Sequence, residues 1–303
     1  MTRYTRNVTR VFVVMTLSLS LLLPLACESD EGGTETSSCD DCFKARVKDF
    51  QNKTLLPGGE CYLLYNVYPD PNTTEDVAKL GQRVADADMP AGYTQPLISG
   101  EGGSLEIMLP AGTKWGFECD LECAGSDCYK KTYQFNISAD TRDYDAEDIW
   151  IISKGMYTLA PSLAGIDLNQ KLGVVAGRLV WYDAADVEEY VGCGELTLET
   201  SDGSQDYEVR YFGGNDMPTS DDPDLGGRES TNPKNGLFIS ANMPLGDVNM
   251  TMRIGDTIVG QEKIFSEGGS VVISNINVGE ALGGSTDATF DANPTPSDCR
   301  SSD

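Results

Sequence analysis

The sequence predicts an all-β protein built from two antiparallel β-sandwich domains, and three observations point to this class. Apolar and polar residues alternate with a period of two over several short runs, which is typical of strands with one buried face. Turn residues such as Asn235-Gly236 and Gly268-Gly269 separate these runs and favour hairpins over β-α-β units. The chain of 303 residues is long enough for two domains of ordinary size.

The individual elements follow from the same patterns. The clearest alternating apolar positions are Leu196 and Leu198, then Tyr207, Val209 and Tyr211, then Val248, Met250, Met252 and Ile254. Polar residues stand between them, so each set predicts a half-buried strand. One segment, Thr73 to Ala85, has helical spacing instead. Thr73 and Asp76 are spaced as a capping box, and Val77, Leu80 and Val84 fall on one face, which predicts a short helix inserted between strands.

The first 26 residues have the pattern of an export signal, with three arginines followed by an apolar run that ends just before Cys27. The residues Leu-Pro-Leu-Ala-Cys at this point resemble the bacterial lipobox. That resemblance implies that Cys27 receives a diacylglycerol and becomes the N-terminus, and Glu28 favours delivery to the outer membrane. We therefore expect an exported, lipid-anchored protein at the outer membrane or cell surface of a Gram-negative bacterium. The alternative is an ordinary signal peptide, with Cys27 free or in a disulfide.

Composition divides the rest of the chain. Residues 27–42 are acidic and lack an apolar run, which predicts a flexible tether. We place the first sandwich at 43–165 and the second at 166–280. Residues 281–303 are a low-complexity tail, and Cys299 within it would allow a disulfide that joins the tail to the body.

The cysteine count agrees with export. The chain has nine cysteines, and setting Cys27 aside leaves an even number suited to disulfides in an oxidising compartment. These candidates are Cys39, Cys42, Cys61, Cys119, Cys123, Cys128, Cys193 and Cys299. Only Cys61 with Cys119 is predicted as a pair, because each shares a strand face with apolar residues. A redox role for Cys39 and Cys42, and zinc binding by the cysteines at 119, 123 and 128, are the less favoured alternatives.

The formal net charge of −26 excludes nucleic acid as a partner and disfavours direct adhesion to anionic lipid headgroups. A solvated surface is the favoured explanation of this charge. We expect no cofactor, but calcium binding by two acidic loops is left open, since calcium takes six to eight oxygen ligands. The candidate ligands are Asp140, Asp143 and Asp145 in the first loop and Asp221, Asp222 and Asp224 in the second.

The second half, Val174 to Val278, resembles the carboxypeptidase regulatory-like (transthyretin-like) family. The resemblance rests on "GVVAGRLVWYD", "VGCGELTLET" and above all "TNPKNGLFISANMPLGDVNMTM". It implies a Greek-key, prealbumin-like sandwich of the carbohydrate-binding-like fold, which is non-catalytic and serves scaffolding, adhesion or glycan contact. The first half has a weaker version of the pattern and is interpreted as a divergent second sandwich.

Catalytic motifs are few. The chain has no histidine, which excludes Ser-His-Asp and Cys-His nucleophilic sites and HExxH metalloproteases, and we expect no enzyme. Trp115, Trp150 and Trp181 are candidates for stacking on sugar rings, although core packing is favoured for each. The sequence therefore predicts a structural or interaction role at the membrane surface, with an envelope protein or a glycan as partner. The alternatives are a carbohydrate-binding module and a calcium-binding adhesion protein.

Overall fold

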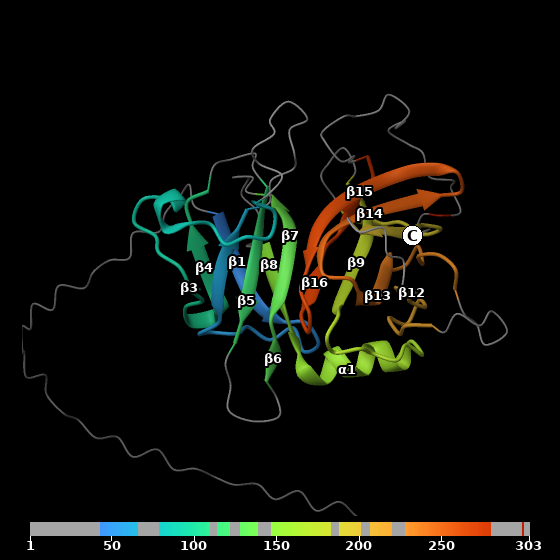
Figure 1. The fold of residues 1–303 in the computed structure, drawn as a ribbon, viewed down its shortest axis with the longest axis horizontal. Coiled ribbons are helices and arrows are strands. Elements are labelled where there is room, and N and C mark those ends of the chain that lie inside the picture. The colour runs from blue at the N-terminus through green and yellow to red at the C-terminus, as the bar shows by residue number, and fades with distance from the viewer. Residues whose placement is uncertain are drawn as a thin grey trace, which may run out of the picture. The chain divides into compact units, whose positions relative to one another are not determined.

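The computed structural model describes residues 43–65, 79–109, 114–121, 128–138, 147–182, 188–200, 207–219, 228–279 and 299. They belong to one compact unit that spans 39–303. Strands arranged in three sheets make up most of the described residues, with one α-helix (Figure 1), so the predicted all-β sandwich class is confirmed. No helix in the described ranges is long and apolar enough to cross a membrane.

Strands from the N-terminal half of the chain form a four-stranded sheet. Its order is β4 (Ser104–Ile107), β1 (Phe43–Asp49), β8 (Glu147–Ser153) and β6 (Tyr129–Lys130). β1 pairs antiparallel with β4 and parallel with β8, so the sheets are mixed and not purely antiparallel. Alternate residues of β1, namely Phe43, Ala45 and Val47, are buried, as a strand with one core-facing side requires.

The largest sheet contains strands from both halves of the chain. Its order is β12 (Glu208–Tyr211), β13 (Leu237–Met243), β9 (Gly173–Tyr182), β16 (Val271–Ile273), β7 (Thr132–Ser138), β5 (Lys114–Asp120), β2 (Glu60–Leu64) and β3 (Leu97–Ile98), with β10 (Glu188–Tyr190) and β17 (Ile276–Asn277) paired to β9. β16 pairs parallel with both β7 and β9. The sheet is therefore continuous across the predicted boundary between residues 165 and 166, and the division into two domains stays a prediction.

The third sheet consists of β11 (Glu195–Thr200), β14 (Gly246–Ile254) and β15 (Thr257–Ser266). Its strands follow the predicted alternation, since Val248, Met250 and Met252 are fully buried and Leu198 lies opposite Met250. Gly255, at the turn between β14 and β15, has a φ of 58°, a left-handed conformation that glycine adopts without strain.

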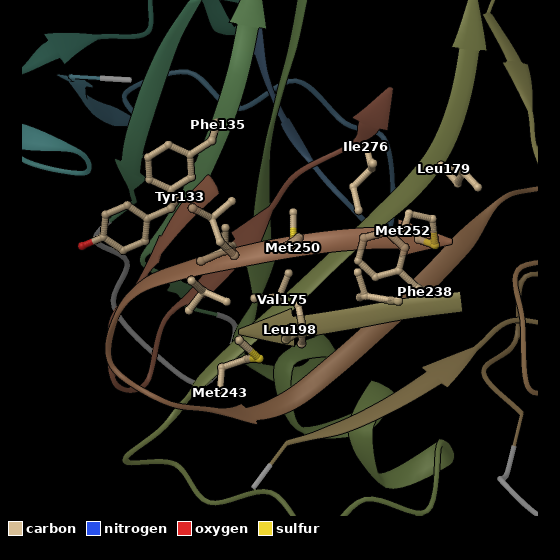
Figure 2. Packing of buried hydrophobic residues seen from close by; sticks show 14 of the residues in the cluster. Tyr133, Phe135, Val175, Leu179, Leu198, Phe238, Met243, Met250, Met252 and Ile276 are labelled. Carbon is tan, nitrogen blue, oxygen red and sulfur yellow. The ribbon is translucent and has the colours of Figure 1, made fainter. Parts of the chain in front are cut away.

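Three hydrophobic clusters hold the sheets together. The first core joins the four-stranded sheet to β2 and β5, with Val47, Leu63 and Phe117 among its fully buried residues. The second core joins the third sheet to the largest sheet, and Figure 2 shows Met250 and Met252 of β14 gathered with side chains of β7, β9 and β13. Each fully buried side chain of this size contributes about 1.5–3 kcal/mol. The third core includes Ile152, Val174 and Ile273 with the helix.

The helix, α1 (Lys154–Leu163), directly follows β8. Ser153 caps it by accepting a hydrogen bond from the Met156 N–H at 3.2 Å. Tyr157 and Pro161 are buried, and Tyr157 belongs to the third core. Two short 3₁₀ turns also lie wholly within the described residues, η2 (Asp86–Asp88) and η3 (Glu101–Gly103).

The predicted helix over Thr73–Ala85 is wrong over residues 80–85, which form a turn and an extended segment. Lys79 has 3₁₀ conformation, and residues 73–78 lie outside the described ranges. Gly81 has a φ of 72°, and the Val84 N–H bonds to the Leu63 carbonyl oxygen as in an extended strand. Leu80 and Val84 are both buried, but Leu80 packs in the second core and Val84 in the first. Their four-residue spacing therefore reflects a chain that crosses between two cores and not one helical face.

Two disulfides join cysteines that both lie among the described residues. Cys61 and Cys119 lie opposite each other on β2 and β5 and are bonded, as their strand faces predict. Cys193 is bonded to Cys299, which joins the tail to the body. Cys128 is also disulfide-bonded, so neither it nor Cys119 has a thiolate available to zinc. The candidates Cys39, Cys42 and Cys123 lie outside the described residues.

Candidate binding surface

The sequence-predicted site residues do not converge on one place. Trp115 on β5, Trp150 on β8 and Trp181 on β9 are each partly buried, and they pack against the first, third and second cores respectively. The six candidate calcium ligands, Asp140, Asp143, Asp145, Asp221, Asp222 and Asp224, lie outside the described residues. Among the residues that the structure does describe, no group of three or more Cys, Asp or Glu side chains could hold a metal ion.

Trp150 nevertheless belongs to an unusual group of side chains. On β8, Ile149 and Ile151 enter the first core, so Trp150 between them lies on the opposite face. The Lys53 Nζ is 4.3 Å from the centre of the Trp150 ring and 4.6 Å from that of Phe50. The two rings meet edge to face with centres 6.1 Å apart. Each cation–ring contact at such a site contributes about 0.5–1 kcal/mol.

Lys48 lies beside the Trp150 ring, and Arg178 contacts a third ring, that of Tyr190. Ala176 of β9 packs with Phe50 and Trp150 in the third core, and Arg178 is the next residue on that face of β9. The Lys48 Nζ is 5.5 Å from the centre of the Trp150 ring. On β9, Arg178 donates a hydrogen bond of 3.0 Å to the Tyr190 hydroxyl, and its guanidinium carbon is 5.0 Å from the centre of that ring. We call the six residues Lys48, Phe50, Lys53, Trp150, Arg178 and Tyr190 the cationic aromatic cluster.

A tight turn after β1 positions Lys53. The buried Asp49 accepts a hydrogen bond of 2.6 Å from the Asn52 N–H through its side chain and one of 2.9 Å from the Lys53 N–H through its carbonyl oxygen. Lys53 has a φ of 59°, a left-handed conformation that costs a residue with a side chain about 1–2 kcal/mol. The turn therefore holds an exposed lysine in a strained conformation, with its ammonium over two aromatic rings.

The cations of the cluster differ in whether they form an ion pair with a carboxylate. Asp148 forms ion pairs with Lys48 at 2.7 Å and with Arg46 at 3.3 Å. Although Lys53 is exposed as a whole, partial burial of its ammonium lowers the pKa of Lys53, and the positive charge of Arg178 lowers that pKa further, whereas Asp148 and Asp49 oppose the shift. Within the described part of the chain, neither Lys53 nor Arg178 forms an ion pair with a carboxylate. The cluster thus contains two cations without a paired anion.

A second group of charged side chains, around Glu118, differs from the cationic aromatic cluster because its charges are paired. Glu118, which is almost fully buried on β5, accepts hydrogen bonds from Arg83 at 2.6 and 3.2 Å and has the Lys131 Nζ at 3.6 Å. Lys131 also pairs with Glu267 at 3.1 Å, and Tyr133 donates a hydrogen bond to the same carboxylate. Burial and this hydrogen bond raise the pKa of Tyr133. Because every carboxylate here has a partner, this network acts as a structural joint between residues distant in sequence.

Comparison with known proteins assigns no family. No family model matches the chain, and no curated protein matches it. Three of the solved structures that resemble it are the shaft pilin SpaA from Lactobacillus rhamnosus GG (9% identity, TM-score 0.22), GBS52, the minor pilin of Streptococcus agalactiae (13%, 0.23), and the major pilin protein T3.2 from Streptococcus pyogenes (9%, 0.21). Each match covers 78% of this chain and at least 95% of the other. TM-scores this low carry no functional assignment.

Proposed function

We propose that this chain is an exported, non-catalytic interaction protein anchored at the cell surface. One observation carries the proposal: each of the five cysteines in the described residues is disulfide-bonded, namely Cys61, Cys119, Cys128, Cys193 and Cys299. Disulfides form and persist in oxidising compartments outside the cytosol. The export signal at residues 1–26 supports the same location.

The proposed anchor is a lipid on Cys27. The lipobox-like sequence supports it, and so does the odd cysteine count, which leaves one cysteine over when the other eight are paired. Several acyl chains on one residue would hold the protein durably, because each buried CH₂ contributes about 0.8 kcal/mol. The first strand begins at Phe43, so the intervening chain could separate the folded body from the membrane by at most roughly 60 Å.

The finer parts of the proposal rest on sequence. Glu28 supports the outer membrane of a Gram-negative bacterium, and the carboxypeptidase regulatory-like resemblance of Val174 to Val278 supports a scaffolding, adhesion or glycan-contact role. Of the two alternative functions, carbohydrate binding is favoured by a specific observation, the cationic aromatic cluster around Trp150. Calcium-dependent adhesion remains a proposal based on the acidic loops.

The test is the intact mass of the protein from its native membrane fraction, compared with a Cys27→Ala variant. We expect a mass increase that matches acylation, and release of the variant into the soluble fraction. Ser38→Ala, a substitution in the same acidic segment, serves as the matched control and should stay in the membrane fraction. An unmodified N-terminus, together with unchanged fractionation of Cys27→Ala, would refute the lipid anchor.

A further inference from the structure

We propose that the cationic aromatic cluster binds the carboxylate groups of an anionic polysaccharide, with Lys53 and Arg178 as the residues that contact the carboxylates. This inference rests on the proposed function, since it names the partner of a non-catalytic interaction protein.

The first argument is that two cations of the cluster form no ion pair with a described carboxylate, although the chain is rich in carboxylates. Acidic residues outnumber basic ones by 48 to 22, so a cation on this protein has many carboxylates to pair with. Lys48 does pair, with Asp148, and Arg83 pairs with Glu118. Lys53 and Arg178, among the described residues, do not form such pairs. The Lys53 ammonium lies over two aromatic rings and Arg178 gives one N–H to Tyr190, so both groups keep donors for an external anion.

The second argument is that the fold brings these cations together against electrostatic repulsion. Ala176 of β9 packs with Phe50 and Trp150 in the third core. Arg178 is the next residue on that face of β9, the side on which Lys53 contacts the two rings. The positive charge of Arg178 accordingly lowers the pKa of Lys53. The turn also holds Lys53 in a left-handed conformation in which glycine would be unstrained. Strained residues persist where the surrounding structure determines them, and they gather at binding sites.

The third argument concerns the chemical class of the ligand. A guanidinium presents paired donors that match the two oxygens of a carboxylate, and an ammonium adds a compact charge beside it. Phe50, Trp150 and Tyr190 surround these groups with aromatic surface, as the ring contacts show. Aromatic rings pack against flat apolar faces, and the C–H faces of a pyranose ring provide such surface whereas an aspartate or glutamate side chain does not. A uronic acid polymer combines both features.

The net negative charge of the protein is compatible with this ligand. At physiological ionic strength, charges beyond about 8 Å are largely screened, so the local cluster and not the whole protein determines binding to an adjacent carboxylate. A uronate polymer carries one charge for each sugar ring, whereas duplex DNA carries one for about every 1.7 Å of its axis. The repulsion that remains after screening is therefore larger for nucleic acid than for a polyuronate.

The experiment measures binding of polygalacturonate to the purified full-length protein by titration calorimetry at low and at physiological salt. We expect binding that weakens with salt, no binding of neutral dextran, and roughly tenfold lower affinity for both Lys53→Gln and Arg178→Gln. Lys171→Gln removes the same charge from an exposed residue outside the cluster and should bind as the native protein does. Lys53→Arg, which keeps the charge, should retain most of the affinity.

Lys53→Gly separates binding from folding. Glycine suits the φ of 59° at this position, so the variant should unfold at or near the native temperature while its affinity falls as in Lys53→Gln. Equal affinity of the native, Lys53→Gln and Arg178→Gln proteins would overturn the site, and so would an equal loss in Lys171→Gln. Binding of polyglutamate as tight as that of polygalacturonate would overturn the assignment to a polysaccharide. Because the assay needs no anchor, a Cys27→Ala protein that binds normally would leave this site intact even if the lipid proposal failed.

Discussion

Removal of the Cys193–Cys299 disulfide should destabilise the protein more than any single surface change. The bond closes a loop with a sequence separation of 106 residues, and loop-closure entropy for that length corresponds to about 5 kcal/mol at 25 °C. Native disulfides deliver about 2–5 kcal/mol in practice, and whole proteins have only about 5–15 kcal/mol of stability. The Gly192 N–H also bonds to the Cys299 carbonyl oxygen at 2.6 Å, a contact that depends on the same linkage. We therefore expect the free energy of unfolding of the Cys193→Ala, Cys299→Ala double variant to fall by about 3–5 kcal/mol.

The assay is urea denaturation of the oxidised proteins, followed by circular dichroism. The double variant should have a lower midpoint and a larger denaturant dependence, because its unfolded chain is less constrained and exposes more surface. The Cys61→Ala, Cys119→Ala pair provides the comparison. Its loop of 58 residues corresponds to about 4 kcal/mol, but both cysteines are fully buried in the first core, so a cavity adds to the loss. A change below about 1 kcal/mol in the Cys193 and Cys299 variant would refute the reasoning.

Three further predictions concern the cores and charges. Gly177→Ala should lower the free energy of unfolding, measured by urea titration, by at least about 3 kcal/mol, because its Cβ would overlap a backbone carbonyl oxygen. Gly58→Ala has open space around the new Cβ, so it should lose only the left-handed strain of about 1–2 kcal/mol, and equal losses in the two variants would contradict this. Arg83→Gln should lower the free energy of unfolding by about 1–2 kcal/mol, because it leaves the buried Glu118 carboxylate short of hydrogen-bond donors, although Arg83 itself is half-exposed. Adding Glu118→Gln to the same chain should recover part of this loss. Burial raises the pKa of Tyr211 to about 12, so folding favours its neutral form. The stability that this group contributes below pH 10 should therefore decline between pH 10 and about 12. Tyrosinate absorbance that develops fully near pH 10 while the fold is retained would refute this.

The parts of the fold that follow from local pattern were predictable. Period-two alternation located β11 and β14, because one face of each strand packs in a core and the other does not. The same logic paired Cys61 with Cys119, since residues on apolar strand faces meet across neighbouring strands. These features depend on residues close together in the chain or on one shared core face.

Features that depend on distant contacts were not predictable. The helix α1 contains Gly155, Thr158 and Pro161, which weaken any helical signal, and its stability comes from the third core. The candidate site shows the same limit, since only Trp150 of its six residues was singled out. Nothing local marks Lys53 or Arg178, because their significance arises from the pairing of segments around residues 50, 150 and 178.

The position of β16 delays completion of the largest sheet. Residues 271–273 fill the gap between β7 and β9 and pair with both, so neither strand has its neighbour on that side until these residues have been made. Until then, β7 presents an unpaired edge that could pair with another chain. Synthesis begins at the N-terminus, whereas completion of the sheet waits for β16. The incomplete chain therefore needs a period of protection that would not be required if each half folded as it was made.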